Sequence, residues 1–208
     1  KTGNPQLLAA VHLYVGEMDA KRGLLTSGRR HTRLGQEMIS RAPNVWLEAV
    51  AENTFLAIAV MHNDFDLGLI HGERALNFAE QSGSATTLRA CLGNLGNLYL
   101  MVGNFDQAIA YFERAIEALP TRGPNTNANL DSLARIRLLQ GRTDACRLLI
   151  SRIDESIQTR SDRLLYPNRY AQLTKTQLAL REGRSSDALN GVEALFDLAV
   201  KTEDWILK

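Results

Sequence analysis

The sequence predicts an all-α fold, a right-handed solenoid of about five antiparallel helical hairpins. Three observations support this fold class: a turn motif that recurs about every forty residues, apolar residues at helical spacing on both sides of each turn, and no alternating strand pattern. The turns lie at 62–66, 103–108, 141–146 and 183–188. When Asn63, Gly103, Gly141 and Gly183 are taken as equivalent, the spacings are 40, 38 and 42 residues.

Ten helical segments follow from this pattern. Leu92, Leu95 and Leu98 share one helical face before the turn at Gly103, and Phe112 lies on the apolar face after it. The predicted helices span 5–15, 18–40 with a break around Gly28, 44–62, 65–82, 85–102, 105–119, 127–140, 144–159, 165–182 and 186–202. Residues that suit a helix junction fall at or near the predicted ends, namely Pro43, Ser84, Pro120, Pro124 and Pro167.

The helices pair into hairpins, and the turn between the third pair is the best specified. The hairpins span 5–40, 44–82, 85–122, 127–160 and 165–202, and we expect a single repeat domain over residues 1–208. Gly103 can adopt the left-handed conformation that ends a helix. Asn104 and Gln107 have capping-box spacing, and Asp106 lies near the positive end of the next helix.

Residues 89–122 contain a set of regularly spaced small and aromatic residues, namely Leu92, Leu95, Gly96, Tyr99, Ala108, Phe112, Ala115 and Pro120. Their spacing resembles the pattern of a tetratricopeptide repeat at every position, with Leu92 in the place of the family's Trp. The resemblance implies that Gly96 and Ala108 are small where paired helices approach closely, while Tyr99 and Phe112 fill the space between hairpins. Neighbouring units match less fully. Their longer period resembles that of regulatory segments in bacterial transcription activators and signalling proteins, and Trp46 is expected to pack in an added helical turn.

Composition excludes several classes of function. The 24 basic and 23 acidic side chains give a net charge of +1, so nothing favours nucleic acid as the main partner. No apolar run is long enough for a membrane helix. Cys91 and Cys146 are expected to be small, buried, reduced residues, and the protein is expected to be cytoplasmic. The chain begins at Lys1 and residues 204–208 read as the start of another amphipathic segment, so we expect a fragment of a longer protein.

No catalytic, metal or cofactor site is predicted. The four histidines, His12, His31, His62 and His71, include no pair three or four residues apart. The glycines of 93–97 lie inside a helical pattern and lack the ending of a phosphate loop. The basic run 29–33 could contact nucleic acid or an acidic partner, although a solvated helix end explains it more simply.

The resemblance implies a ligand groove on the first helix of each hairpin. Carried over by register, the groove positions are Asn53, Asn94, Asn97, Met101, Asp131, Arg135, Tyr170, Gln177 and Arg181, with Ala57 beside Asn53. Their amides and guanidinium groups suit an extended peptide backbone or a carboxylate. Asn97 fits one position of the family's carboxylate clamps, but Gly93 occupies the place of their Lys, so a chaperone-tail clamp is not expected.

The predicted function is a protein-interaction or scaffold module that binds a partner protein or peptide, as the regulatory segment of a bacterial transcription or signalling protein. A sensor of a small molecule or peptide effector is the alternative, and an enzyme is the least favoured class. Groove polarity separates the first two, because an effector needs an enclosed apolar pocket. A homodimer through a terminal hairpin stays open.

Overall fold

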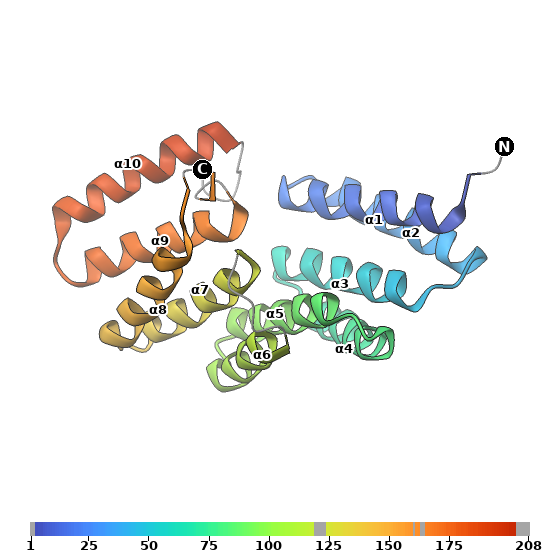
Figure 1. Cartoon of the computed structure of the whole chain (residues 1–208), viewed down its shortest axis with the longest axis horizontal. Coiled ribbons are helices and arrows are strands. Elements are labelled where there is room, and N and C mark those ends of the chain that lie inside the picture. The colour runs from blue at the N-terminus through green and yellow to red at the C-terminus, as the bar shows by residue number, and fades with distance from the viewer. Residues whose placement is uncertain (1–2, 119–123, 160, 163–164, 203–208) are drawn as a thin grey trace. The chain divides into compact units, whose positions relative to one another are not determined.

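The computed structural model describes residues 3–118, 124–159, 161–162 and 165–202, and these form ten α-helices and no strand (Figure 1). The helices are α1 Pro5–Lys21, α2 Leu25–Arg41, α3 Val45–Met61, α4 Phe65–Ser82, α5 Ala85–Met101, α6 Phe105–Ala118, α7 Pro124–Leu139, α8 Thr143–Ser156, α9 Tyr166–Arg181 and α10 Ser185–Thr202. Each odd-numbered helix packs against the helix that follows it. The prediction of an all-α fold made of helical hairpins is therefore confirmed.

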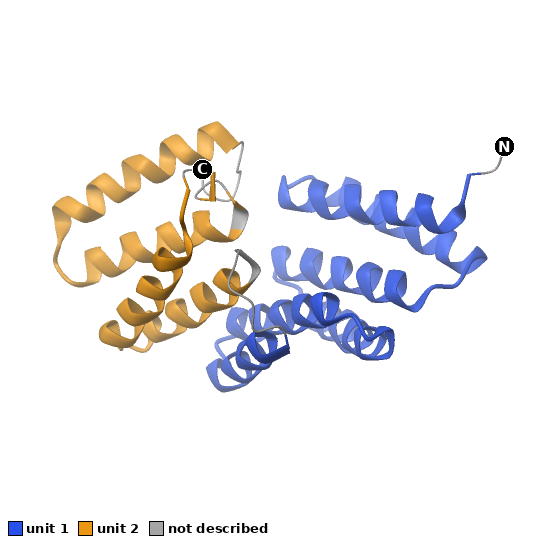
Figure 2. Cartoon of the chain, in the orientation of Figure 1, with its two compact units in different colours: residues 1–119 blue, residues 120–208 orange. Residues whose placement is uncertain are grey.

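Packing divides the chain into two compact units, residues 1–119 and 120–208 (Figure 2). Unit 1 contains α1 to α6 and unit 2 contains α7 to α10. The expected Pro120 and the segment 204–208 lie outside the described residues.

Unit 1 is a stack of three hairpins with a strict period. Its first helices begin at residues 5, 45 and 85 and end at 21, 61 and 101, so equivalent residues are 40 apart. The first helices lie side by side, because α3 contacts both α1 and α5. Each second helix also contacts the first helix of the next hairpin, α2 with α3 and α4 with α5. This arrangement gives every helix in the middle of the stack at least two neighbours to bury its apolar face against.

The turns inside the hairpins share one backbone feature. Gly23, Asn63, Gly103, Gly141 and Gly183 all have a left-handed φ, between 56° and 80°. Glycine takes this conformation without strain, and asparagine is among the few other residues that tolerate it. The equivalence of four turns inferred from sequence is thus visible in the backbone, and Gly23 adds a fifth turn that lies 40 residues before Asn63.

The first hairpin lies where it was predicted, but the helix boundaries inside it were wrong. We expected helices at 5–15 and 18–40 with a break near Gly28, but α1 runs to Lys21 and α2 continues through Gly28. Gly28 is small for a packing reason, since a Cβ there would lie 2.9 Å from the carbonyl oxygen of Gly16. The two glycines let α1 and α2 cross closely, and Gly23 makes the turn.

Small residues also set the helix spacing in the third hairpin. A Cβ on Gly96 would lie 2.6 Å from Cε1 of Phe112, whose ring is fully buried. Ala108 is buried beside it on the same helix as Phe112. A cluster of Leu56, Leu95 and Leu98 joins this hairpin to the one before it. The close approach expected at Gly96 is therefore present.

Two local expectations were only partly met. Asn104 accepts from the backbone N–H of Gln107, but its own N–H donates to the carbonyl of Tyr99, so only half of the expected capping box forms. Trp46 is 45% exposed at the start of α3, and its Nε1 donates to Thr87 Oγ1 of α5 at 2.9 Å. Trp46 therefore ties neighbouring first helices together at their N-terminal ends.

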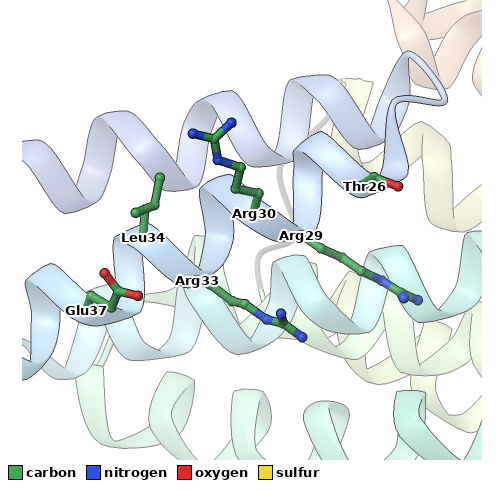
Figure 3. Close-up of a pocket in the computed structure, with 6 residues that line it drawn as sticks. All are labelled: Thr26, Arg29, Arg30, Arg33, Leu34 and Glu37. Carbon is green, nitrogen blue, oxygen red and sulfur yellow. The ribbon is translucent and has the colours of Figure 1, made fainter.

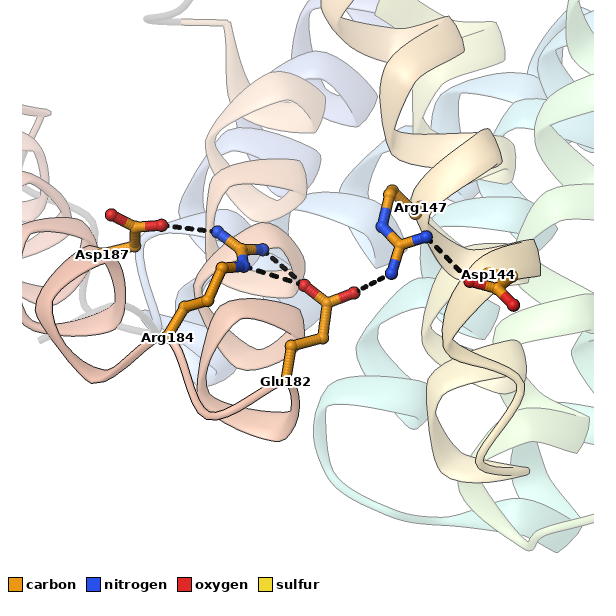
Figure 4. A network of polar contacts seen from close by, with 5 residues as sticks. All are labelled: Asp144, Arg147, Glu182, Arg184 and Asp187. Atoms are coloured by element: carbon orange, nitrogen blue, oxygen red, sulfur yellow. Dashed lines mark hydrogen bonds and ion pairs between the residues drawn. The ribbon is translucent and has the colours of Figure 1, made fainter.

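Unit 2 is built of two hairpins joined by contacts of α9 with both α7 and α8. An ionic network on its surface runs from α8 to the first turn of α10 (Figure 4). Arg147 pairs with Asp144 and with Glu182, and Arg184 pairs with Glu182 and Asp187. Hydrogen bonds from Arg184 and Arg147 lower the pKa of the Glu182 carboxyl. The network holds the end of α9 against α8.

Candidate functional site

The predicted groove residues of unit 1 lie on neighbouring first helices. Asn53 of α3 and Asn94 of α5 meet directly, with Asn94 Nδ2 donating to Asn53 Oδ1 at 3.0 Å. Asn97 is half-buried on α5. Met101 is also half-buried and packs against the cluster that contains Leu98. These four side chains therefore belong to the two first helices α3 and α5, which lie in contact.

The Asn53–Asn94 bond is one of three polar pairs with the same sequence separation. Asn127 Nδ2 of α7 donates to Asn168 Oδ1 of α9 at 2.8 Å, and Trp46 bonds Thr87 as described above. Members of each pair are 41 residues apart, one residue more than the period of unit 1. Polar residues at this separation were the available sequence signal for contacts between first helices, and only Asn53 and Asn94 had been singled out.

The other predicted groove residues lie in unit 2. One of them, Asp131, does not lie at the surface where the prediction placed it. The Asp131 side chain is buried, with a relative exposure of 2%, so it does not line an open surface. Arg135 Nε lies 3.4 Å from its carboxylate, and Arg135 also donates to Ser132 Oγ. Tyr170 is half-buried, whereas Gln177 and Arg181 are exposed on α9. The predicted groove residues of unit 2 that solvent can reach are therefore those of α9, together with the outer part of the Arg135 side chain.

Burial changes the chemistry of Asp131. Desolvation raises the pKa of its carboxyl, while the charge of Arg135 and hydrogen bonding by Thr174 lower it less. Its Oδ1 has no hydrogen-bond partner among the described residues. The helical periodicity of α7 did not reveal this, because α7 is polar on several faces and packs against both α8 and α9. Asp131 is therefore a residue of the interior.

Two histidine contacts escaped the sequence analysis. His71 Nδ1 of α4 lies 2.6 Å from Oε2 of the buried Glu52, and Gln36 of α2 donates to the other oxygen of that carboxylate. His12 and His31 meet between α1 and α2 with their Nδ1 atoms 2.9 Å apart. Residues 19 apart on antiparallel helices gave no motif to recognise. Both contacts join helices of unit 1 and are accounted for by packing.

The basic run 29–33 lines a hollow on α2 of about 410 Å³ (Figure 3). Arg29 and Arg33 extend from the helix on the same side, and Arg30 extends from another side. Thr26, Leu34 and Glu37 complete the lining. Arg29 and Arg33 are one helical turn apart, so their like charges repel unless an anion or a carboxylate lies near them. The hollow is open and charged.

Metal-ligating clusters and reactive thiols are two further features that a chemical site would need. In the ranges that the structure describes, no three His, Cys, Asp or Glu side chains are grouped as a metal site would need. Cys91 and Cys146 are buried and unbonded, and burial raises the pKa of their thiols to about 12 and about 11. Thiols of this kind are poor nucleophiles at neutral pH. Among the described helices, none is long and apolar enough to cross a membrane.

Comparison with known proteins agrees with the fold. The tetratricopeptide repeat family model matches residues 48–121. A crystal structure described as a putative kinesin light chain of Podosopora anserina with nearly identical TPR-like repeats is 12% identical, covers 98% of this chain and 99% of its own, and has a TM-score of 0.63. The pilF protein of Pseudomonas aeruginosa is 13% identical, with 97% and 96% coverage and a TM-score of 0.40. A search of curated sequences finds no significant match.

The matched segment begins within α3 and continues through α4, α5 and α6, the helices that carry Asn53, Asn94 and the Gly96–Phe112 contact. The likeness to the kinesin light chain repeats extends the same fold over nearly the whole chain. Repeats of this family generally bind proteins or peptides. Residues 48–121 match the tetratricopeptide repeat family model, and the chain has the tetratricopeptide-like helical fold.

Proposed function

We propose that this chain is a non-catalytic scaffold that binds an extended segment of a partner protein along its first helices. The observation that carries the proposal is the Asn53–Asn94 pair, which places two amides together where α3 and α5 meet. Asn97 and Met101 lie further along α5 and extend the surface toward its C-terminal end. In unit 2, Arg135, Tyr170, Gln177 and Arg181 supply the corresponding groups.

The chemistry of these side chains suits a peptide backbone. An amide side chain both donates and accepts hydrogen bonds. Because Asn53 and Asn94 share one hydrogen bond, each keeps further donor or acceptor groups. An extended peptide presents N–H and C=O groups along both of its edges. Met101 adds a flexible apolar contact for a side chain of the partner. Arg181 can pair with a carboxylate of the partner.

The test is partner capture by the double variant Asn97→Ala, Arg181→Ala. Arg135 is left intact because it pairs with the buried Asp131. Proteins crosslinked to the wild-type chain are quantified by mass spectrometry. The captured amount of a true partner is expected to be lower by about tenfold or more with the variant. The matched control is Asn77→Ala, Arg152→Ala, which removes an exposed amide and an exposed guanidinium from second helices. If the variant and control capture the same proteins equally, the groove assignment is wrong.

An effector sensor is the alternative function. It would hold its ligand in an enclosed apolar pocket. The hollow on α2 is open and lined by three arginines and a glutamate, so it supports the scaffold rather than the sensor.

The finer proposal is that the scaffold belongs to a bacterial transcription or signalling protein and works in the cytoplasm. The forty-residue period and the two free, buried cysteines support it. The complete reading frame tests it, because a DNA-binding, kinase or cyclase domain beside the repeats is the expected finding. A reading frame that couples them to a secretion signal would contradict it.

A further inference from the structure

The arginine-lined hollow belongs to the body of α2 (Figure 3). Arg29, Arg30 and Arg33 lie within the helix, so the basic run is not the solvated helix end that the sequence suggested. In the part of the chain that the structure describes, the guanidinium groups of these three arginines make no ion pair or hydrogen bond. Arg147 and Arg184, by contrast, each pair with two acidic side chains. The hollow therefore presents uncompensated positive charge.

The face that holds the hollow is open to solvent in every hairpin of unit 1. Helices α2, α4 and α6 begin at residues 25, 65 and 105, so positions 30 and 33 correspond to 70 and 73 and to 110 and 113. All six positions are exposed. In the middle hairpin, which has a hairpin on each side, Ile70 is still 49% exposed. The openness of the hollow therefore does not come from a missing neighbour at the start of the stack.

The charge of this face is reversed on α2. Arg33 occupies the position of Glu73 in α4 and of Glu113 in α6. Helix α2 carries four arginines and one glutamate, whereas α4 and α6 each carry three acidic residues and one arginine. The fold of the repeat therefore does not require arginine at this position. Like charges one turn apart destabilise a helix, and an anionic partner that lies near both of them removes this cost.

Two guanidinium groups one helical turn apart match the spacing of alternate residues in an extended peptide. Arg29 and Arg33 are four residues apart, which is about 6 Å along the helix axis. In an extended peptide, side chains on the same side are two residues apart, or about 6.6 to 6.8 Å. Each guanidinium group can hold one carboxylate through paired N–H donors. The hollow therefore fits carboxylates at alternate positions of a peptide, and Leu34 offers an apolar contact beside them.

The lining favours the carboxylates of a peptide over the phosphates of a nucleic acid. Among the described residues that line the hollow, none is aromatic, so a base would have no ring to stack on. Glu37 adds a negative charge at the C-terminal end of the hollow, which repels a continuous row of phosphates. The net charge of the whole chain is only +1. A peptide, in contrast, can place a neutral residue opposite Glu37.

We propose that the hollow on α2 binds an acidic, extended segment of a partner protein, with carboxylates at alternate positions held by Arg29 and Arg33. Arg30, on another side of the helix, adds to the positive field that draws the segment in. The hollow lies on a second helix and shares no residue with the groove of the first helices. It is therefore a second contact of the scaffold, and it does not depend on the groove.

The test is fluorescence anisotropy of a labelled peptide, with glutamate at every second position and serine between, titrated with the 208-residue chain. We expect binding that weakens as salt is raised, because the contacts are ionic and exposed. The double variant Arg29→Gln, Arg33→Gln is expected to bind at least about tenfold more weakly. Glutamine has nearly the helix propensity of arginine, so circular dichroism is expected to show the same helix content.

Two further variants separate the hollow from a general effect of charge. The matched control is Arg142→Gln, Arg152→Gln, which removes the same charge from exposed positions of unit 2 and is expected to bind like the wild type. Glu37→Gln removes the negative charge of the lining and is expected to bind about two- to threefold more tightly. A gain of affinity cannot result from unfolding.

Three results would overturn the proposal. The first is a peptide that does not bind, or that binds the Arg29→Gln, Arg33→Gln variant as well as the wild type. The second is a single-stranded DNA of the same charge that binds more tightly than the peptide and is lost with the same variant, since the hollow would then contact nucleic acid. The third is an equal loss with the groove variant Asn97→Ala, Arg181→Ala, which is expected to bind this peptide like the wild type.

Discussion

Asp131 is an acid held in the interior of unit 2, with an arginine at one side as its principal compensation. Because desolvation outweighs the attraction of Arg135, the pKa of Asp131 is higher in the folded chain than the ordinary 3.8 of an exposed aspartate. The folded state then holds the proton more tightly than the unfolded state does. This contribution to stability is present below the unfolded pKa and is lost as pH rises through the folded pKa.

We predict that Asp131→Asn removes this pH dependence. The unfolding free energy of the wild type should decline as pH is raised above about 4, in part because the buried carboxyl must ionise, and the variant should decline less. Urea unfolding across this range measures the difference. A parallel series on Glu113→Gln, an exposed acid on α6, separates burial from the general effect of removing one negative charge. Equal slopes for Asp131→Asn and the wild type would contradict the shift.

At the residue scale, the sequence predicted small residues better than polar ones. Gly96 stood in a known pattern of spaced positions, and its close contact with Phe112 follows from its size alone. Asp131 was assigned to the groove because its register is right for that face, but register does not reveal that α9 lies over it. Burial of a polar side chain depends on a neighbour that is distant in sequence.

In the third hairpin, the packing of the two helices depends on Gly96, which has no side chain. Helices α5 and α6 can pack at their observed spacing because Gly96 leaves room for the ring of Phe112. That ring is fully buried.

We predict that Gly96→Leu lowers the unfolding free energy by about 1–3 kcal/mol, since added methylene groups would force the two helices apart. Chemical denaturation measures the loss. Ala110→Leu places the same side chain at an exposed position of α6 and should change stability by less than about 0.5 kcal/mol. Equal stability of the Gly96→Leu variant and the wild type would mean that the helices do not cross where the structure places them.

At the element scale, predictions held where the turn chemistry was distinctive. Four turns were recognised from small or polar residues around a glycine or asparagine, and all four have the left-handed residue. The first turn was missed because Gly23 is followed by two leucines, which extend the helical pattern across it. Gly28 was mistaken for a break, because a glycine required by helix crossing and one required by a turn look alike in sequence.

For the whole molecule, the division into two units has a consequence for folding. Helices α1 to α6 contact one another and form a compact unit, so we expect unit 1 to be stable without unit 2.

We predict that a fragment of residues 1–118 retains its helices and unfolds cooperatively. Far-UV circular dichroism should show a helical signal per residue comparable with that of the whole chain, and urea should produce one transition. A fragment of residues 1–72, which ends inside α4 and lacks α5 and α6, provides a comparison and should lose most of its helical signal. A fragment 1–118 without helical structure would show that the two units fold only together.

The first helices of the first three hairpins have matching bounds, so the gene should tolerate the loss or duplication of a whole hairpin. Because α1, α3 and α5 start forty residues apart without insertion or deletion, recombination between any two of them would excise or duplicate a complete structural module. The junction would join helices whose mating surfaces already correspond. The length of such an array can therefore change by whole forty-residue modules.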